Sequence, residues 1–163
     1  MTPEVRTYLP LERFVLATRF RVGTIAGDLP VTQRYLAGGA SSQRGFPERR
    51  LAPTVTRVKD DGSSVSVVIG GGALLEASAE LRTRLGKLIG IDWSGVLFLD
   101  GGDVTERLDG LDVTHLHWAA GAGLRAATPV GPVRVDVGYR LNRLDDLRPG
   151  ERVAYHLSLG EAF

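Results

Sequence analysis

The chain has 163 residues, a formal net charge of +1 and no cysteine. This length suggests one domain, the small charge gives no sign of a nucleic-acid partner, and the lack of cysteine excludes a disulfide scaffold and a cysteine-ligated metal site. No run of about 18 apolar residues predicts a transmembrane helix, and the N-terminus shows no signal-peptide pattern. A membrane β-barrel stays compatible with these facts, because strands of about 10 alternating residues leave no strong hydropathy peak.

Alternation of apolar and polar residues dominates the chain and predicts antiparallel strands. A short first strand is expected at residues 4–9. Six longer segments alternate clearly: 13–26, 73–85, 92–100, 115–127, 133–142 and 152–160. The sequence PVGP at 129–132 predicts a tight turn. Ala, Leu and Glu in residues 73–85 also favour a helix, but a strand separates the charged from the apolar side chains, so we interpret this segment as a strand.

The two faces of these strands differ in character. One face is almost free of charge, and the other carries Arg, Glu, Asp, His, Ser and Gly. This pattern predicts an all-β, antiparallel transmembrane β-barrel with apolar side chains towards lipid and a polar lumen. Five aromatic residues lie on or near strand ends of the apolar face: Trp93, Trp118, Tyr139, Tyr155 and Phe163. Such placement is typical of a membrane-interface girdle.

The alternative to a membrane barrel is a soluble antiparallel sandwich with a dry core. In a sandwich, Leu75, Leu97 and Val135 would be covered by protein on the apolar side of their strands. In a barrel, the same side chains point outward to lipid. The exposure of these three residues therefore separates the two folds.

Residues 27–72 form a connection far longer than an ordinary hairpin loop. It contains the flexible, polar stretch AGGASSQRGFPERR at residues 37–50. Residues 54–58 and 65–69 can pair as a hairpin around the Asp60-Asp61-Gly62 turn. We expect one extended excursion, with room for that hairpin and without a compact helix.

Several motifs resemble one family. RYLAGGASSQRGF at 34–46, followed by LAP at 51–53, resembles the sixth extracellular loop of the outer-membrane assembly-factor superfamily, the BamA/TamA-like bacterial surface antigens. The loop signature of that family is matched by Gly38, Gly39, Arg44, Gly45 and Phe46, whereas Gln43 stands where Val or Ile is usual. Four further matches follow in the order of the family: ASAEL at 77–81, GVLFLDGGDV at 95–104, GAGLRAATPVGPVRVDVGYRLN at 121–142 and VAYHLSLGEAF at 153–163.

The resemblance implies a set of site residues. In the family, the loop folds back into the lumen and its arginine meets acidic groups on the inner wall. Carried over, Arg44 pairs with Glu80 and Asp100, and Gln43 is expected to weaken the packing of the loop tip. The strand motif that contains Asp100 also includes Phe98 and Gly102. The implied closing strand carries Tyr155, Leu157, Leu159 and Phe163.

The resemblance also implies a function. The expected protein is an outer-membrane barrel that aids insertion or translocation of proteins through a weak seam between its first and last strands; the alternative is a passive barrel without insertase activity. It is expected to be no enzyme and to hold no cofactor. Expected partners are the lipid bilayer, client outer-membrane or secreted proteins and, in one reading, further copies of the chain, with no nucleic acid. His115 and His117 on one strand face can seed a metal site, but lumen lining is the simpler interpretation.

The length conflicts with a complete family barrel of 16 strands preceded by POTRA domains. We expect residues 1–163 to form a single barrel domain or barrel fragment without a POTRA domain. Three explanations stay open at this point. The chain is the C-terminal part of a longer product, or it closes a short barrel of about eight strands that includes the hairpin at 54–69, or several copies complete one barrel.

Overall fold

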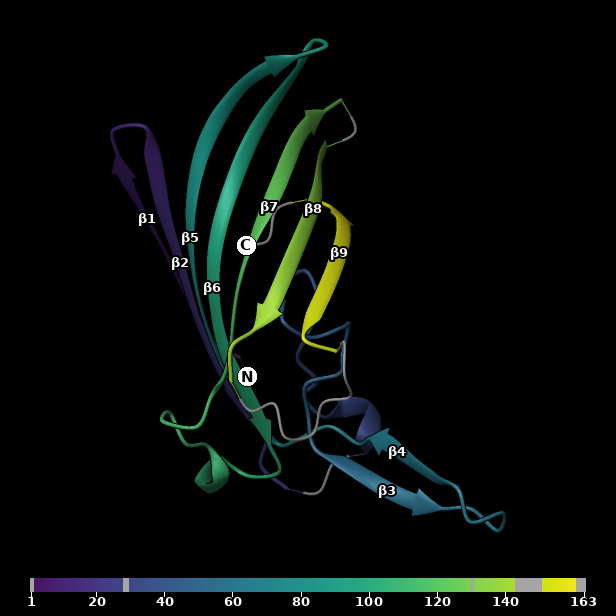
Figure 1. Cartoon of the computed structure of the whole chain (residues 1–163). Coiled ribbons are helices and arrows are strands. Elements are labelled where there is room, and N and C mark those ends of the chain that lie inside the picture. Colours follow the sequence, from purple (N-terminus) through teal and green to yellow (C-terminus); the bar gives the residue numbers. More distant parts are fainter. Residues whose placement is uncertain (1, 28–29, 130, 143–150, 161–163) are drawn as a thin grey trace.

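The computed structural model describes residues 2–27, 30–129, 131–142 and 151–160, and the regular secondary structure of these residues is almost entirely β (Figure 1). Two short 3-10 turns, η1 (Val31–Gln33) and η2 (Leu108–Gly110), lie in the connections. The described strands are β1 (Glu4–Leu11), β2 (Phe14–Thr24), β3 (Thr54–Val58), β4 (Ser64–Val68), β5 (Ala73–Leu88), β6 (Ile91–Thr105), β7 (His117–Thr128), β8 (Gly131–Arg140) and β9 (Val153–Leu159). The fold class is therefore the one that the alternation predicts.

Seven strands form one antiparallel sheet in the order β1-β2-β5-β6-β7-β8-β9. In the part of the chain that the structure describes, β3 and β4 pair only with each other, and their hairpin projects from the large sheet (Figure 1). Of the three explanations left open, the one in which this hairpin helps to close a barrel of about eight strands is wrong, because the hairpin pairs with neither edge of the sheet. Within the described residues β1 and β9 do not pair with each other, so the sheet is open.

The two ends of the sheet are built differently. At one end, two-residue turns connect β1 to β2, β5 to β6 and β7 to β8. The turn at Ile89 and Gly90 has two positive φ angles, of 53° and 77°, which matches the right-handed twist of its strands. At the other end lie residues 106–116 and the described parts of the long connections 25–72 and 141–152. In bacterial membrane barrels, short turns face the periplasm and long loops face outside, so the long connections mark the expected outer end.

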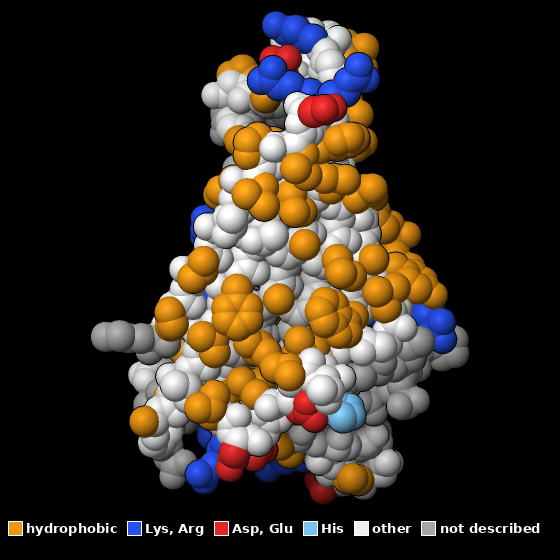
Figure 2. All heavy atoms as spheres, turned by 90° about the vertical axis from the view of Figure 1, so that its left-hand side faces the viewer, with side chains coloured by type: hydrophobic (Ala, Val, Ile, Leu, Met, Phe, Trp, Pro, Cys, Tyr) orange, Lys and Arg blue, Asp and Glu red, His pale blue; other side chains and the backbone are white. Residues whose placement is uncertain are grey.

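The outward face of the sheet is apolar and open. Leu97 is 61% exposed and Val135 is 48% exposed, and hydrophobic side chains cover the middle of this face between charged ends (Figure 2). Leu75 differs, since it is only 7% exposed beside its cross-strand partners Val22 and Asp103. A soluble sandwich would bury this whole face, whereas the sheet leaves its central part uncovered. No helix among the described residues is long and apolar enough to cross a membrane.

Trp93 and Trp118 lie on the outward face near opposite ends of the sheet. Trp118 is the cross-strand partner of Gly101, so eight residues of β6 separate the two levels. Eight residues span about 27 Å along a strand, or about 20 Å along the axis of a barrel whose strands tilt by about 40°. This height is close to the apolar band of about 25 Å in outer-membrane barrels. Phe163, expected in the same girdle, lies outside the described residues.

The inner side of the sheet is polar and buried, which reverses the pattern of a soluble protein. Its largest fully buried side chains include charged groups on the strands, namely Glu76, Glu80, Asp100, Arg134 and Asp136. A small apolar cluster packs the base of the long loop against the strands and consists of Ala37, Phe46, Leu51, Leu74 and Val104. Burial on this side therefore comes from the loop that covers it.

Candidate functional site

The tip of the long loop is a compact turn that folds back onto the inner face of the sheet. Short β-bridges join Tyr35 to Gly71 and Ala37 to Leu51, and so close the base of the turn. Gly38 and Gly39 take positive φ angles of 98° and 111°, which few other residues adopt. The Gly39 N–H donates to the Phe46 carbonyl at 3.0 Å, so the double glycine sets the bend that presents the next residues to the wall.

Arg44 lies between the two carboxylates that the resemblance implies. Its Nε donates to Asp100 Oδ2 at 2.7 Å and its Nη2 to Asp100 Oδ1 at 2.8 Å, so the contact with Asp100 is bidentate. Its Nη1 forms an ion pair with Glu80. Ser78 Oγ accepts from Nη2 at 3.2 Å and donates to Asp100 at 2.6 Å. The Arg44 side chain is 1% exposed, so this network, the Arg44 clamp, is sealed from bulk water.

The surroundings of the Arg44 guanidinium keep it charged. Burial by itself lowers the pKa of Arg44, but the hydrogen bonds and charge of Asp100, together with the charge of Glu80, outweigh burial and raise that pKa above its ordinary value. The guanidinium carbon also lies 3.6 Å from the centre of the Phe98 ring, a cation–π contact. A planar guanidinium can satisfy both carboxylates and the ring at once, whereas a lysine ammonium cannot.

The wall also holds the main chain of the loop tip. Five carbonyl oxygens of the tip each accept a hydrogen bond from a wall side chain. Arg134 donates to Ala40 at 2.9 Å, Arg19 to Ser41 at 2.7 Å and to Ser42 at 3.5 Å, His156 to Arg44 at 3.0 Å and Arg140 to Gly45 at 2.6 Å. Sequence reasoning did not identify these wall residues. Their polar-face positions were visible, but their acceptors are backbone atoms, which carry no signature in the sequence.

Two further carboxylates on the wall are shared between partners. Glu76 accepts from Arg21 Nε at 2.6 Å and from the hydroxyl of Ser42 in the loop. Asp136 accepts from Arg125 Nη1 at 2.7 Å and from Arg134 Nη2 at 3.0 Å. These two buried carboxylates therefore each have a cationic partner, as the cost of an unpaired buried charge requires.

Gln43 and Phe46 flank the clamp. The Gln43 side chain accepts from the Gly45 N–H at 2.8 Å and donates to the His117 carbonyl at 3.1 Å. The Phe46 ring meets the His117 ring edge to face at 5.2 Å, and the Arg140 guanidinium lies 3.8 Å from its centre. Gln43 is 1% exposed. Its amide thus joins the loop tip to the start of β7, a contact that Val or Ile could not make.

Small residues let the loop approach the wall closely. A Cβ added to Gly45 would lie 2.6 Å from the Cβ of Ala119, and one added to Gly138 would overlap the Arg44 carbonyl oxygen. A Cβ at Gly121 would overlap the Phe98 ring. Glycine at these positions therefore makes room for the Arg44 main chain and for the aromatic ring beneath its guanidinium.

The remaining predicted residues fall outside the clamp. Gly102 lies in β6 beside the Glu76 and Gln43 side chains. Tyr155, Leu157 and Leu159 lie on the outward face of β9 and do not face the loop. Their side chains are 76%, 75% and 72% exposed, respectively. Phe163 lies outside the described residues.

The prediction that His115 and His117 share one strand face is wrong. The strand β7 begins at His117, and His115 lies in the preceding loop, where it pairs with Asp112 at 2.7 Å. His117 contacts Asp103 at 3.4 Å. In the described part of the chain no group of three or more His, Asp or Glu residues is arranged to hold a metal ion.

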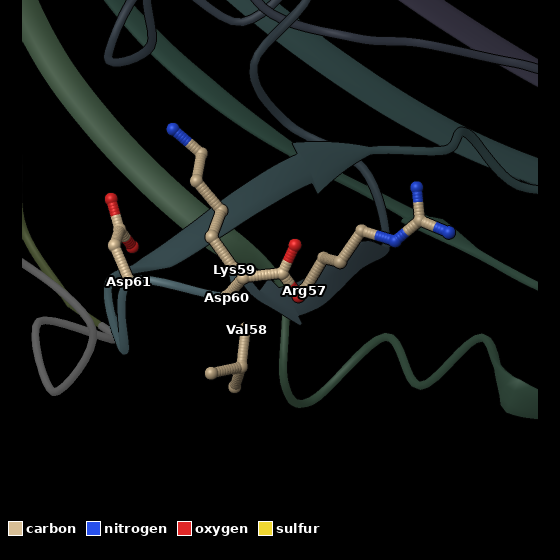
Figure 3. A pocket seen from close by; sticks show the side chains of 5 residues that line it. All are labelled: Arg57, Val58, Lys59, Asp60 and Asp61. Carbon is tan, nitrogen blue, oxygen red and sulfur yellow. The ribbon is translucent and has the colours of Figure 1, made fainter.

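A shallow hollow at the turn of the β3–β4 hairpin is separate from the clamp. It is lined by Arg57, Val58, Lys59, Asp60 and Asp61. In Figure 3 the Lys59 and Asp61 side chains point to the same side, and Val58 points to the opposite one. This hollow contains none of the wall residues, so the clamp is the better candidate site.

Comparisons with known proteins agree with this geometry. Residues 1–163 match the Omp85 superfamily domain. Among solved structures, the chain is similar to BamA from Haemophilus ducreyi lacking POTRA domains 1-3, with 22% sequence identity and a TM-score of 0.71. That similarity covers 96% of this chain and 33% of the BamA chain, so the chain spans about a third of the length of that structure. The family match over the whole sequence, together with a shared fold, leads to one conclusion: this chain belongs to the Omp85 superfamily.

Proposed function

We propose that the chain is part of an outer-membrane β-barrel that aids the insertion or translocation of other proteins, with lipid and unfolded client proteins as its partners. The observation that carries the proposal is the seating of the loop tip on the polar inner wall by the Arg44 clamp, under a sheet whose outward face is apolar. Membership of the Omp85 superfamily supports the same function. The proposed activity is physical and breaks no bond.

The physical basis lies at the sheet edge and at the outward face. An unpaired strand edge offers a template for another strand, and β1 and β9 are such edges within the described residues. A client strand cannot enter lipid with unpaired backbone groups. Pairing on an edge beside the apolar face would satisfy those groups while the client crosses the interface.

A reconstituted assembly assay tests the proposal. The protein purified from membranes is placed in phospholipid vesicles, and the folding rate of an unfolded β-barrel client is followed by its protease resistance. We expect faster folding than in empty vesicles, and a smaller acceleration with the Arg44→Ala variant. Equal folding rates with wild-type protein and with empty vesicles would contradict the proposal and favour the alternative, a passive barrel. Single-channel conductance recorded from the same vesicles would then test for such a barrel.

A further inference from the structure

The last strand, β9, is held by few contacts. It pairs only with β8 among the described residues, over Val153–Leu159. Its outward side chains are open, and Tyr155 is 76% exposed. Its inward residues are Ala154, His156 and Ser158, since these alternate with the outward ones. An edge strand with so few buried contacts belongs to the less stable part of a fold, so any additional contact strongly affects how long it stays paired.

One such contact joins β9 to the loop. His156 is 9% exposed, and its Nε2 lies 3.0 Å from the carbonyl oxygen of Arg44. A carbonyl oxygen can only accept, so Nε2 carries the hydrogen and donates it. The cross-strand partner of His156 is Asp136, which is already occupied by Arg125 and Arg134. Among the described residues this is the one polar contact between β9 and the loop tip.

A glycine on β8 leaves the space that this contact needs. Gly138 of β8 pairs with Ala154 of β9, and a Cβ at Gly138 would overlap the Arg44 carbonyl oxygen and lie 3.2 Å from the Gly45 nitrogen. The absent side chain lets the Arg44 main chain rest on β8 within reach of β9. The bond to His156 therefore depends on where the loop tip sits.

The other end of Arg44 fixes that position. Its guanidinium is held by Asp100 on β6 and by Glu80 on β5. Arg44 thus connects the middle of the sheet, through its side chain, with the edge strand, through its carbonyl. We infer that His156 is a positioning residue that couples the Arg44 clamp to β9, so that seating the loop holds the edge strand and releasing the loop frees it. The inference rests on the proposed function for its meaning, because β9 is the edge that a client would meet.

Hydrogen–deuterium exchange of the protein purified from membranes, in detergent micelles, tests the coupling. The variant His156→Leu removes the donor, His156→Gln keeps a donor, and Asp100→Asn loosens the clamp three strands away from β9. We expect β9 amides to exchange about fivefold faster in His156→Leu and in Asp100→Asn, since a lost hydrogen bond changes an equilibrium by about that factor. His156→Gln should stay near the wild-type rate.

The double variant separates coupling from independent damage. If the clamp acts on β9 through His156, then His156→Leu combined with Asp100→Asn exchanges at β9 no faster than the faster single variant. Multiplied effects in the double variant, or unchanged β9 exchange in Asp100→Asn, would overturn the inference. Where His156→Leu fails to fold, Gly138→Ala displaces the Arg44 carbonyl instead and leaves the imidazole intact.

The exchange result does not depend on client assembly. If coupling is present but vesicles show no accelerated folding of a client, the proposed function fails and this inference stands. If client folding is accelerated but β9 exchange is insensitive to the clamp, only the inference fails.

Discussion

Arg44 contacts the wall through both its side chain and its main chain. Its guanidinium meets Asp100, Glu80, Ser78 and the Phe98 ring. Its N–H donates to Asp100 at 3.1 Å. A residue with this many buried partners leaves several groups uncompensated when it is lost.

Arg44→Ala is therefore expected to lower the free energy of unfolding by about 3–5 kcal/mol, because Asp100 would stay buried without its cation, while Glu80 keeps its ion pair with Arg82. Arg44→Lys should recover only part of this loss, since an ammonium cannot bridge both carboxylates. Asp100→Asn should reproduce the loss in part. Urea unfolding followed by tryptophan fluorescence in detergent measures the effect. Unfolding midpoints equal to the wild type would show that the clamp does not stabilise the fold.

A second prediction concerns Gln43. Valine, which is usual in the family at this position, is expected to make this chain less stable. Gln43→Val leaves the Gly45 N–H and the His117 carbonyl without their present partner. We expect a loss of about 1–3 kcal/mol, the cost of unsatisfied buried groups. Gln43→Glu keeps an acceptor for Gly45 but removes the donor to His117 and adds a buried charge, so a larger loss is expected. A stabilised Gln43→Val variant would contradict the role assigned to the amide.

Strands β6, β7 and β8 meet through glycines on the inner face, and this packing can be tested with one added methyl group. A Cβ at Gly121 would overlap the Val137 carbonyl and the Phe98 ring. Gly121→Ala is expected to cost about 1–3 kcal/mol, as overpacking does. Gly95→Ala is the matched control on the outward face of β6, because its Cβ would make only an ordinary contact of 3.4 Å with Leu85. Equal stability of the two variants in urea would refute close packing at Gly121.

The loop between β6 and β7 provides a pH-dependent prediction. Hydrogen bonds from the Thr114 side chain and main chain, and from His115, lower the pKa of Asp112 to about 2. Because the folded pKa lies below the unfolded value of about 3.9, the stabilisation is present above pH 4 and is lost as pH falls towards 2. Carboxyl NMR should find the midpoint near 2, and Thr114→Val should raise it. A wild-type midpoint at the ordinary value would show that these hydrogen bonds do not form.

Much of this architecture follows from the sequence alone. Alternation in residues 13–26 and 133–142 predicted strands because one side is polar and faces the loop, whereas the other side is apolar and open. The closure of a short barrel was not predictable, since the pattern of residues 54–58 and 65–69 shows that a hairpin forms but not which edge it joins. The wall contacts of Arg134, Arg140 and His156 were hidden because their acceptors are loop carbonyls.

The whole sheet has one apolar and one polar side. We therefore expect a water-soluble reagent to reach cysteines introduced on the loops but not those on the apolar side. The chain has no cysteine, so single cysteines can be introduced without a background. Leu97→Cys is expected to resist a membrane-impermeant maleimide in vesicles, because its side chain faces outward in the apolar band. Asp60→Cys, at the turn of the β3–β4 hairpin, should react readily. Fast labelling at both positions would show that the outward face is not in lipid.

The sequence separation between Arg44 and its partners also determines when the loop tip can bind the wall. Arg44 and Asp100 are 56 residues apart, and Arg44 and His156 are 112 residues apart. Contacts of such separation form late, because loop-closure entropy must be overcome before they contribute. The loop tip precedes β5 to β9 in the order of synthesis, yet it has no wall to bind until those strands are in place. Docking of the loop tip therefore follows the pairing of β5 and β6, and a chain interrupted before β6 would carry its motif without the Asp100 partner.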